Sequence, residues 1–213
     1  MGLEALLRLE VIYNPTMKII AAVLGAVALA VLVVALWAVG AYNGIVGKNE
    51  AVKTAWAGVE NQYQRRSDLI PNLVEVVKGS SKFEKDTLTA VVEARAKVGQ
   101  VTLGKGVLED PAAFKKFEEA QSGLSSALSR LMVVVEKYPE LKSTQGFRDL
   151  QVQLEGTENR VAVARMDFNN SAQDYNTAIK RFPGSLVAGF GGFKERPYFS
   201  AAPEASKAPA VKF

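Results

Sequence analysis

The chain contains neither histidine nor cysteine among its 213 residues. Without histidine it lacks the commonest general base and transition-metal ligand, and serine triads that use histidine are excluded. Without cysteine it can form no thiol nucleophile, zinc–thiolate site or disulfide. Carboxylate-bridged di-iron bundles also need histidine. Ser–Lys or paired-carboxylate chemistry stays possible in principle, but the sequence has no motif for it. We therefore expect no cofactor, no metal site and no enzymatic activity.

Long runs of basic residues are also missing. The formal net charge is +4, and Lys and Arg interleave with Asp and Glu along the chain, so no nucleic-acid-binding arm is expected. The hydrophobic fraction is 48%, which is enough to bury a core.

One long segment has no charge at all. Ile19–Val39 reads IIAAVLGAVALAVLVVALWAV, which as a helix would span roughly 30 Å, the thickness of the hydrocarbon core of a bilayer. Lys18 precedes it, and Trp37 and Tyr42 lie where interfacial aromatics are found. The segment predicts a transmembrane anchor that binds membrane lipid. The alternative is a cleaved signal peptide ending near Ala38-Val39-Gly40, but the apolar stretch is longer than such peptides usually have.

The flanking charges give a weak signal for orientation. Lys18 lies on the near side and the first charge beyond the span is Lys48, which favours a cytoplasmic N-terminus and a bundle on the periplasmic or extracellular side. Farther along, Lys53, Arg65 and Arg66 oppose that reading.

Three later segments carry a heptad pattern, with two columns of mostly apolar residues in each. The columns are Val52, Val59, Arg66, Leu73 with Trp56, Tyr63, Ile70, Val77; Phe114, Gln121, Leu128, Val135 with Phe117, Leu124, Leu131, Tyr138; and Phe147, Leu154, Val161, Phe168, Tyr175, Phe182 with Leu150, Thr157, Ala164, Ser171, Ala178. A shorter amphipathic helix lies between the first and second of these segments and uses Phe83, Leu88, Val91, Val92 and Val98. A repeat of 3.5 residues makes helices pack side by side. The sequence therefore predicts an all-α fold in which a transmembrane helix precedes an elongated, antiparallel four-helix-type bundle.

Turn and cap residues divide the chain into four parts. We expect an N-terminal extension at 1–16, the anchor at 17–41, the bundle at 42–185 and a glycine-rich segment with a disordered tail at 186–213. Inside the bundle, breaks or caps are expected at Gly79-Ser80-Ser81, 101–109, Asp110-Pro111, Pro139, Ser143 or Thr144, and Phe182-Pro183-Gly184.

Two positions in the chain invite a bend. Pro71 lies inside the first heptad segment and should kink that helix or divide it in two. The anchor should run straight on into the bundle, with flexure at Gly40, Gly44 and Gly47.

The densest local pattern surrounds Arg66, which falls in a core column. Because an unpaired buried charge is costly, we expect an ion pair with Asp68 or Glu158 that sets the helix register, or else a polar surface for a partner. The candidate interaction or register residues are Arg65, Arg66, Asp68, Pro71, Glu75, Lys78, Glu158, Arg160, Phe190 and Phe193. The last two belong to an apolar, glycine-rich stretch at 186–193 that is too short to span a membrane. It should either fold back over the bundle or dock on membrane or a partner.

Several of these stretches together resemble the LemA family of bacterial membrane proteins. The matching residues are Tyr42-Asn43, the 65–79 block with Asp-Leu-Ile-Pro-Asn-Leu-Val-Glu, Glu84-Lys85, Thr87-Leu88, Glu93-Ala94-Arg95, Thr157-Glu158-Asn159-Arg160, Tyr175–Ile179, Phe182-Pro183-Gly184 and Phe193–Phe199. One departure is Phe83, where the family often has histidine. The resemblance implies a helical bundle on one transmembrane helix of the bacterial cytoplasmic membrane, with no established enzymatic activity. It also suggests a part in membrane organisation.

The expected function is a non-enzymatic scaffold that self-associates as a homo-oligomer. The heptad length and the small-residue stripe Ala22, Ala26 and Ala30 in the anchor support this expectation. The alternative is a monomeric adaptor or sensor that docks a membrane protease or a signalling protein.

Overall fold

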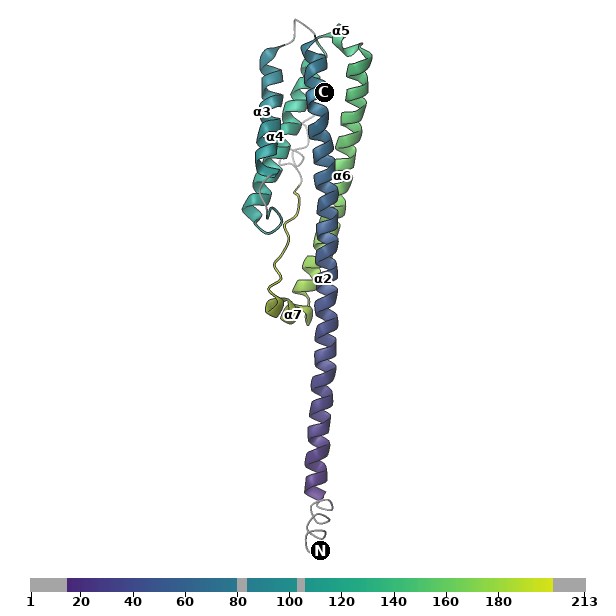
Figure 1. Cartoon of the computed structure of the whole chain (residues 1–213), viewed down its shortest axis with the longest axis vertical. Helices are drawn as coiled ribbons and strands as arrows, with labels where there is room; N and C mark the ends of the chain where they lie inside the picture. Colours follow the sequence, from purple (N-terminus) through teal and green to yellow (C-terminus); the bar gives the residue numbers. More distant parts are fainter. Residues whose placement is uncertain (1–14, 80–83, 103–105, 201–213) are drawn as a thin grey trace, which may run out of the picture.

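A computed structural model describes residues 15–79, 84–102 and 106–200 of the chain (Figure 1). These residues form helices and connecting segments and contain no strand, so the predicted all-α class is confirmed. The helices are α2 (Pro15–Lys78), α3 (Lys85–Thr102), α4 (Pro111–Val135), α5 (Pro139–Lys142), α6 (Gln145–Lys180) and α7 (Gly184–Gly191). Most of the predicted N-terminal extension, Phe83 and the predicted tail from Ala201 onward lie outside the described residues.

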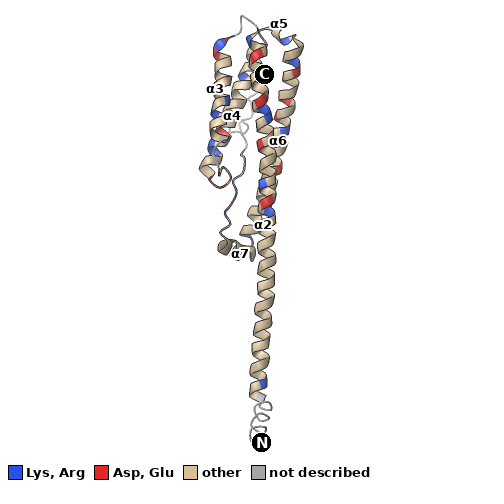
Figure 2. Ribbon diagram, viewed as in Figure 1, with Lys and Arg blue, Asp and Glu red and all other residues tan. Residues whose placement is uncertain are grey.

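The anchor and the first bundle helix are one continuous helix. α2 has 64 residues, which corresponds to about 96 Å. Its first half extends below the rest of the molecule with its side chains exposed, and Figure 2 shows no charge on it between Lys18 and Lys48. It is the one described helix long and apolar enough to cross a membrane. The helix runs through Gly40, Gly44 and Gly47 without a break.

The bundle consists of two helix pairs. α6 runs antiparallel along α2, and the α3–α4 hairpin packs beside this pair (Figure 1). Two hydrophobic clusters follow one another along the bundle axis. The cluster nearer the anchor contains Trp56, Tyr63, Phe114, Phe117, Phe168 and Tyr175, and the distal one contains Ile70, Leu73, Leu124, Leu131, Phe147 and Leu154. The predicted elongated, bundle-like packing is confirmed.

Most of the predicted core positions are buried, but Phe182 and Val92 are exposed, and Tyr138, Ala164, Ser171 and Ala178 are only half-buried. Every residue predicted in the columns of α2 is buried, Arg66 included. The prediction was wrong for Phe182, whose side chain is 80% exposed because α6 ends at Lys180, and for Val92, which is 49% exposed on the outer side of α3. Tyr138 follows the end of α4 and is only half-buried.

The helix ends agree with their predicted signals. The Asp110 carboxylate accepts a hydrogen bond from the Ala112 N–H at 2.8 Å and caps α4, with Pro111 in its first turn. Thr144 caps α6 by accepting from the Phe147 N–H at 3.4 Å. At Gly184 a Cβ atom would lie 2.5 Å from the Ala178 carbonyl oxygen. Only glycine therefore allows α7 to return this closely onto α6.

Pro71 does not divide its helix, so the prediction of two separate helices was wrong. α2 continues through Pro71 to Lys78. Proline has no N–H, and the carbonyl of Ser67 four residues earlier therefore loses its helical donor. Arg95 of α3 replaces that donor, because its Nε donates to the Ser67 carbonyl oxygen at 3.1 Å. The neighbouring helix thus satisfies the backbone group that proline leaves unpaired.

Residues 184–200 are part of the bundle rather than a segment that follows it. The glycine-rich stretch forms helix α7, which packs on both α2 and α6, and Ala188 is buried there. After Gly192, residues 193–200 run as an extended arm back along the bundle (Figure 1). The expected fold-back onto the bundle is seen, and a contact of its exposed side with membrane or a partner stays a prediction.

Candidate functional site

A polar layer centred on Arg66 separates the two hydrophobic clusters. The Arg66 side chain is only 1% exposed. Its Nη1 donates to Glu158 Oε1 of α6 at 2.8 Å and to Ser125 Oγ of α4 at 2.8 Å. Its Nη2 donates to the side-chain and main-chain oxygens of Gln121, which is also buried. The layer joins three helices through one guanidinium group, because five donors in a fixed plane can serve several acceptors at once.

The predicted ion pair of Arg66 is therefore made with Glu158. Asp68 is exposed and accepts a hydrogen bond from Gln64 at 2.7 Å. The Glu158 side chain is 44% exposed, so water reaches one end of the ion pair. The Nε of Arg66 is buried and has no hydrogen-bond partner among the described residues.

A hollow of about 500 Å³ opens onto this layer between α4 and α6. Glu118 lies at its rim, where its Oε1 accepts from Arg165 at 3.4 Å and from the backbone N–H and the hydroxyl of Ser200 at 3.1 Å each. Charged side chains of both signs therefore line the hollow. Burial raises the pKa of Tyr63 in its wall, although Arg165 and Arg66 nearby act in the opposite direction.

A second set of polar contacts attaches the C-terminal arm to α6. Asn176 donates to the Arg196 carbonyl at 2.8 Å and accepts from the Arg196 N–H at 2.8 Å. Asn169, one heptad earlier, makes the same two bonds with Phe199 at 3.0 and 2.9 Å. Each asparagine amide thus satisfies both backbone groups of one arm residue, as a neighbouring β-strand would.

The arm also reaches the other helices through two side chains. Arg196 donates to the Leu108 carbonyl and to Asn49 of α2, both at 3.0 Å. Phe199 is 6% exposed, and its ring lies 6.0 Å from Trp56 and 4.9 Å from Phe114 between ring centroids. The arm therefore closes the proximal hydrophobic cluster. Sequence reasoning missed these contacts, although two asparagines seven residues apart within a helix were a usable signal, since asparagine is a poor helix former.

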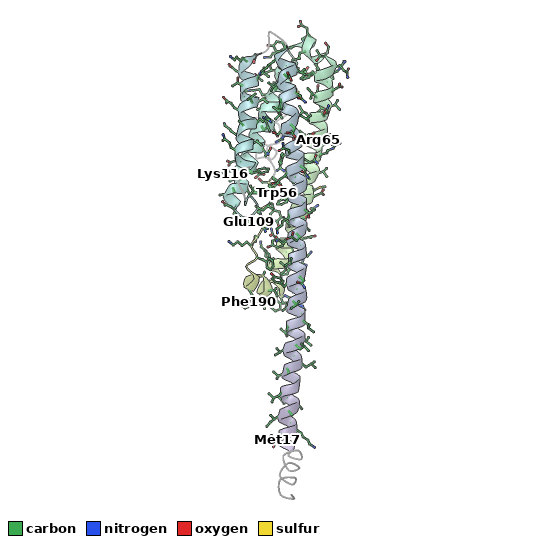
Figure 3. The ribbon with its side chains drawn as sticks, in the orientation of Figure 1. Met17, Trp56, Arg65, Glu109, Lys116 and Phe190 are labelled. Atoms are coloured by element: carbon green, nitrogen blue, oxygen red, sulfur yellow. The ribbon has the colours of Figure 1, made fainter. Side chains whose placement is uncertain are left out.

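The other predicted residues do not converge on one place. Arg65, Pro71, Glu75, Lys78 and Arg160 are exposed along the outside of the bundle. Phe193 is half-buried and packs on Tyr42 of α2, with ring centroids 5.4 Å apart. Phe190 is 95% exposed and points away from the bundle on α7, on the side toward Met17 (Figure 3).

The described residues contain no group of His, Cys, Asp or Glu that could hold a metal ion. The Arg66 layer has an arginine, a glutamine, a serine hydroxyl that accepts a hydrogen bond from the arginine, and a half-exposed carboxylate. Its geometry suits the joining of helices or the binding of a polar partner group.

Comparison with known proteins gives a consistent result. The sequence profile of the LemA family matches residues 55–213. Magnetosome protein MamQ of Magnetospirillum gryphiswaldense is 31% identical over 180 residues, which cover 76% of this chain and 65% of the relative. Magnetosome proteins MamQ 1 and MamQ 2 of Paramagnetospirillum magneticum are 29% identical over the same lengths. The match thus spans somewhat less than two-thirds of the length of these relatives. On this profile match and these relatives, the chain belongs to the LemA family.

Proposed function

We propose that the chain is a non-enzymatic scaffold, anchored in the bacterial cytoplasmic membrane by α2, that self-associates through the outer face of its α3–α4 hairpin. The anchor span and the first bundle helix are continuous, so the bundle stands on the membrane as a rod. In this proposal the bundle lies on the periplasmic or extracellular side. The magnetosome proteins named above fit a role in organising membranes, and that role is part of the proposal.

The observation that carries the proposal is a groove of about 860 Å³ between α3 and α4. Many of the residues that line it are small, namely Ala90, Ala94, Ala120, Gly123, Ser126 and Ala127. Small side chains let the backbone of another helix approach closely. Both walls carry charges of both signs, with Glu93 and Lys97 on α3, and Glu119 and Arg130 on α4. A second copy of the same hairpin can match such a surface, because a two-fold contact that pairs an acidic residue of one copy with a basic residue of the other makes the same pair twice.

Gly123 provides a sharp test. It is exposed in the groove, and a Cβ there would meet no atom within 4 Å. Gly123→Leu should therefore leave the single chain folded while filling the groove. The matched control is Gly156→Leu on α6, which is also an exposed helical glycine with open space around it and lies outside the groove.

The measurement is the mass of the full-length protein extracted in its native lipids. The wild type and Gly156→Leu should give a discrete oligomer and Gly123→Leu a smaller species. A monomeric wild type would refute self-association. An oligomer that Gly123→Leu leaves intact would refute the groove as its contact.

A monomeric adaptor is the second candidate function. The hollow at the Arg66 layer, open to solvent beside Glu158, favours it. Arg65 precedes Arg66 in α2 and is exposed on the outside of the bundle. In that case Arg65→Glu should abolish co-purification of a partner, while the far-ultraviolet circular dichroism stays unchanged. Retained co-purification would exclude Arg65 from the contact.

A further inference from the structure

We propose that α7 is a second membrane contact, inserted shallowly into the bilayer leaflet from which α2 emerges. This inference rests on the membrane anchor of the proposed function. It adds to that anchor a surface of the folded bundle that lies in the lipid headgroup region.

The position of α7 along α2 carries the argument. Gly191, at its end, lies so close to α2 that a Cβ there would be 3.3 Å from the Tyr42 ring. Val187 and Phe190 of α7 line one apolar hollow with Ala38 and Val39 of α2. Those two α2 residues are the last of the uncharged span. Because α7 contacts this point, it lies at the level where the span leaves the hydrocarbon core.

The composition of α7 fits that level. Residues 182–193 contain no charged residue, and in Figure 2 the ribbon of α7 carries neither the colour of basic nor that of acidic residues. One side of α7 packs on the bundle through Ala188. Leu186 and Phe190, four residues apart and so on one helix face, are 55% and 95% exposed, and Phe182 before the helix is 80% exposed. A short helix without charged residues, with one side packed on the bundle and an apolar side exposed, suits an interface between protein and lipid.

The flanking residues are those expected at a membrane surface. Arg181 and Lys194 border the uncharged stretch, and both are exposed. Trp37 and Tyr42 are each 44% exposed on α2 at the same level. Cations attract anionic lipid headgroups, and amphipathic aromatic rings prefer the interface. The lipid surface is therefore the occupant that matches both the apolar face and its charged border. Two contacts, α2 and α7, would fix the tilt of the bundle on the membrane.

The absence of cysteine allows a test with single fluorescent labels on the full chain. A fluorophore is attached at Gly189→Cys, an exposed α7 position at which a Cβ has open space and which leaves Phe190 and Leu186 in place. Leu29→Cys reports on the middle of the anchor, and Val152→Cys, 68% exposed on α6 far from the span, reports on water. The protein is placed in vesicles of phosphatidylcholine and phosphatidylglycerol. Quenching is measured with lipids that carry a nitroxide near the headgroup or near the bilayer centre, and with aqueous iodide.

The label at Gly189 should be quenched most by the shallow nitroxide and little by iodide, and Phe190→Asp in the same chain should reverse that order. The labels at Leu29 and Val152 should respond to the deep nitroxide and to iodide, respectively. If lipid nitroxides do not quench the label at Leu29, the transmembrane anchor of the proposed function is refuted. If Leu29 is quenched as expected but Gly189 responds only to iodide, or to no quencher because protein covers it, the α7 inference alone is overturned.

Discussion

The Arg66 layer yields a quantitative prediction about stability. Arg66→Met keeps the length and apolar stem of the side chain but removes the donors that Gln121, Ser125 and Glu158 accept from. Glu158 is 44% exposed and can turn to water, whereas Gln121 is 4% exposed and cannot. The main cost is therefore the unsatisfied amide of Gln121, about 1–3 kcal/mol of unfolding free energy. Because a buried ion pair contributes little beyond its own desolvation, no larger loss is expected from the missing charge.

Two further variants separate this explanation from a general loss of packing. Arg66→Met combined with Gln121→Leu removes the unsatisfied amide as well, so the double variant should recover at least half of the lost stability. Glu158→Gln keeps a hydrogen-bond acceptor at a half-exposed site, and its effect should stay under about 1 kcal/mol.

Urea unfolding of the full-length protein in mild detergent measures all three variants. Trp56 in the proximal cluster provides the fluorescence signal, with Trp37 replaced by Phe in every protein compared. The reasoning would be refuted if Arg66→Met were neutral, or if Gln121→Leu made the Arg66→Met protein less stable still. Either result would mean that the layer is held by interactions other than the hydrogen bonds of its buried amide.

Three further predictions follow from other contacts. Asn176→Ala removes two hydrogen bonds to the C-terminal arm, so it should lower the free energy of unfolding by about 1–3 kcal/mol and speed hydrogen exchange in the arm. Asn170→Ala, at an exposed position, should change neither the stability nor the exchange. Pro71→Ala restores a helical donor for the Ser67 carbonyl, so the free energy of unfolding, measured with urea, should rise by about 1–3 kcal/mol. Arg95→Gln should then lower the free energy of unfolding less in the Pro71→Ala protein than in the wild type. Burial holds the pKa of Tyr63 above its ordinary value of 10.0, so the folded state keeps this proton to higher pH than the unfolded state. The corresponding stability is present below pH 10 and is lost as the pH rises further, a loss that Tyr63→Phe should reduce.

Each of these predictions has its own contrary result. Unchanged exchange in Asn176→Ala would mean that Phe199 and Arg196 hold the arm without it. Equal costs of Arg95→Gln in both backgrounds would mean that Arg95 does not compensate for the proline. If Tyr63→Phe loses stability above pH 10 as steeply as the wild type, another group controls the alkaline transition.

The helices and their core faces could be predicted from the sequence because they depend on local periodicity. A heptad repeat of apolar residues defines a buried stripe wherever the helix packs, and Val52, Leu124 and Phe168 are fully buried as the pattern required. Cap residues such as Asp110 and Thr144 act on backbone groups two or three positions away, so their effect is also readable locally. The uncharged span likewise depends on composition and length alone.

Tertiary structure decided which distant groups meet. Glu158 rather than Asp68 became the partner of Arg66 because α6 packs on α2 in one particular register. Pro71 stayed within a continuous helix because Arg95 of a different helix supplies the missing donor. The arm carrying Phe199 entered the core because Asn169 and Asn176 present paired donors and acceptors to its backbone. Each of these depends on contacts between residues far apart in the sequence, whose energies no local pattern encodes. The sequence by itself determined the helices and their apolar faces, and the packing of those helices determined their polar partners.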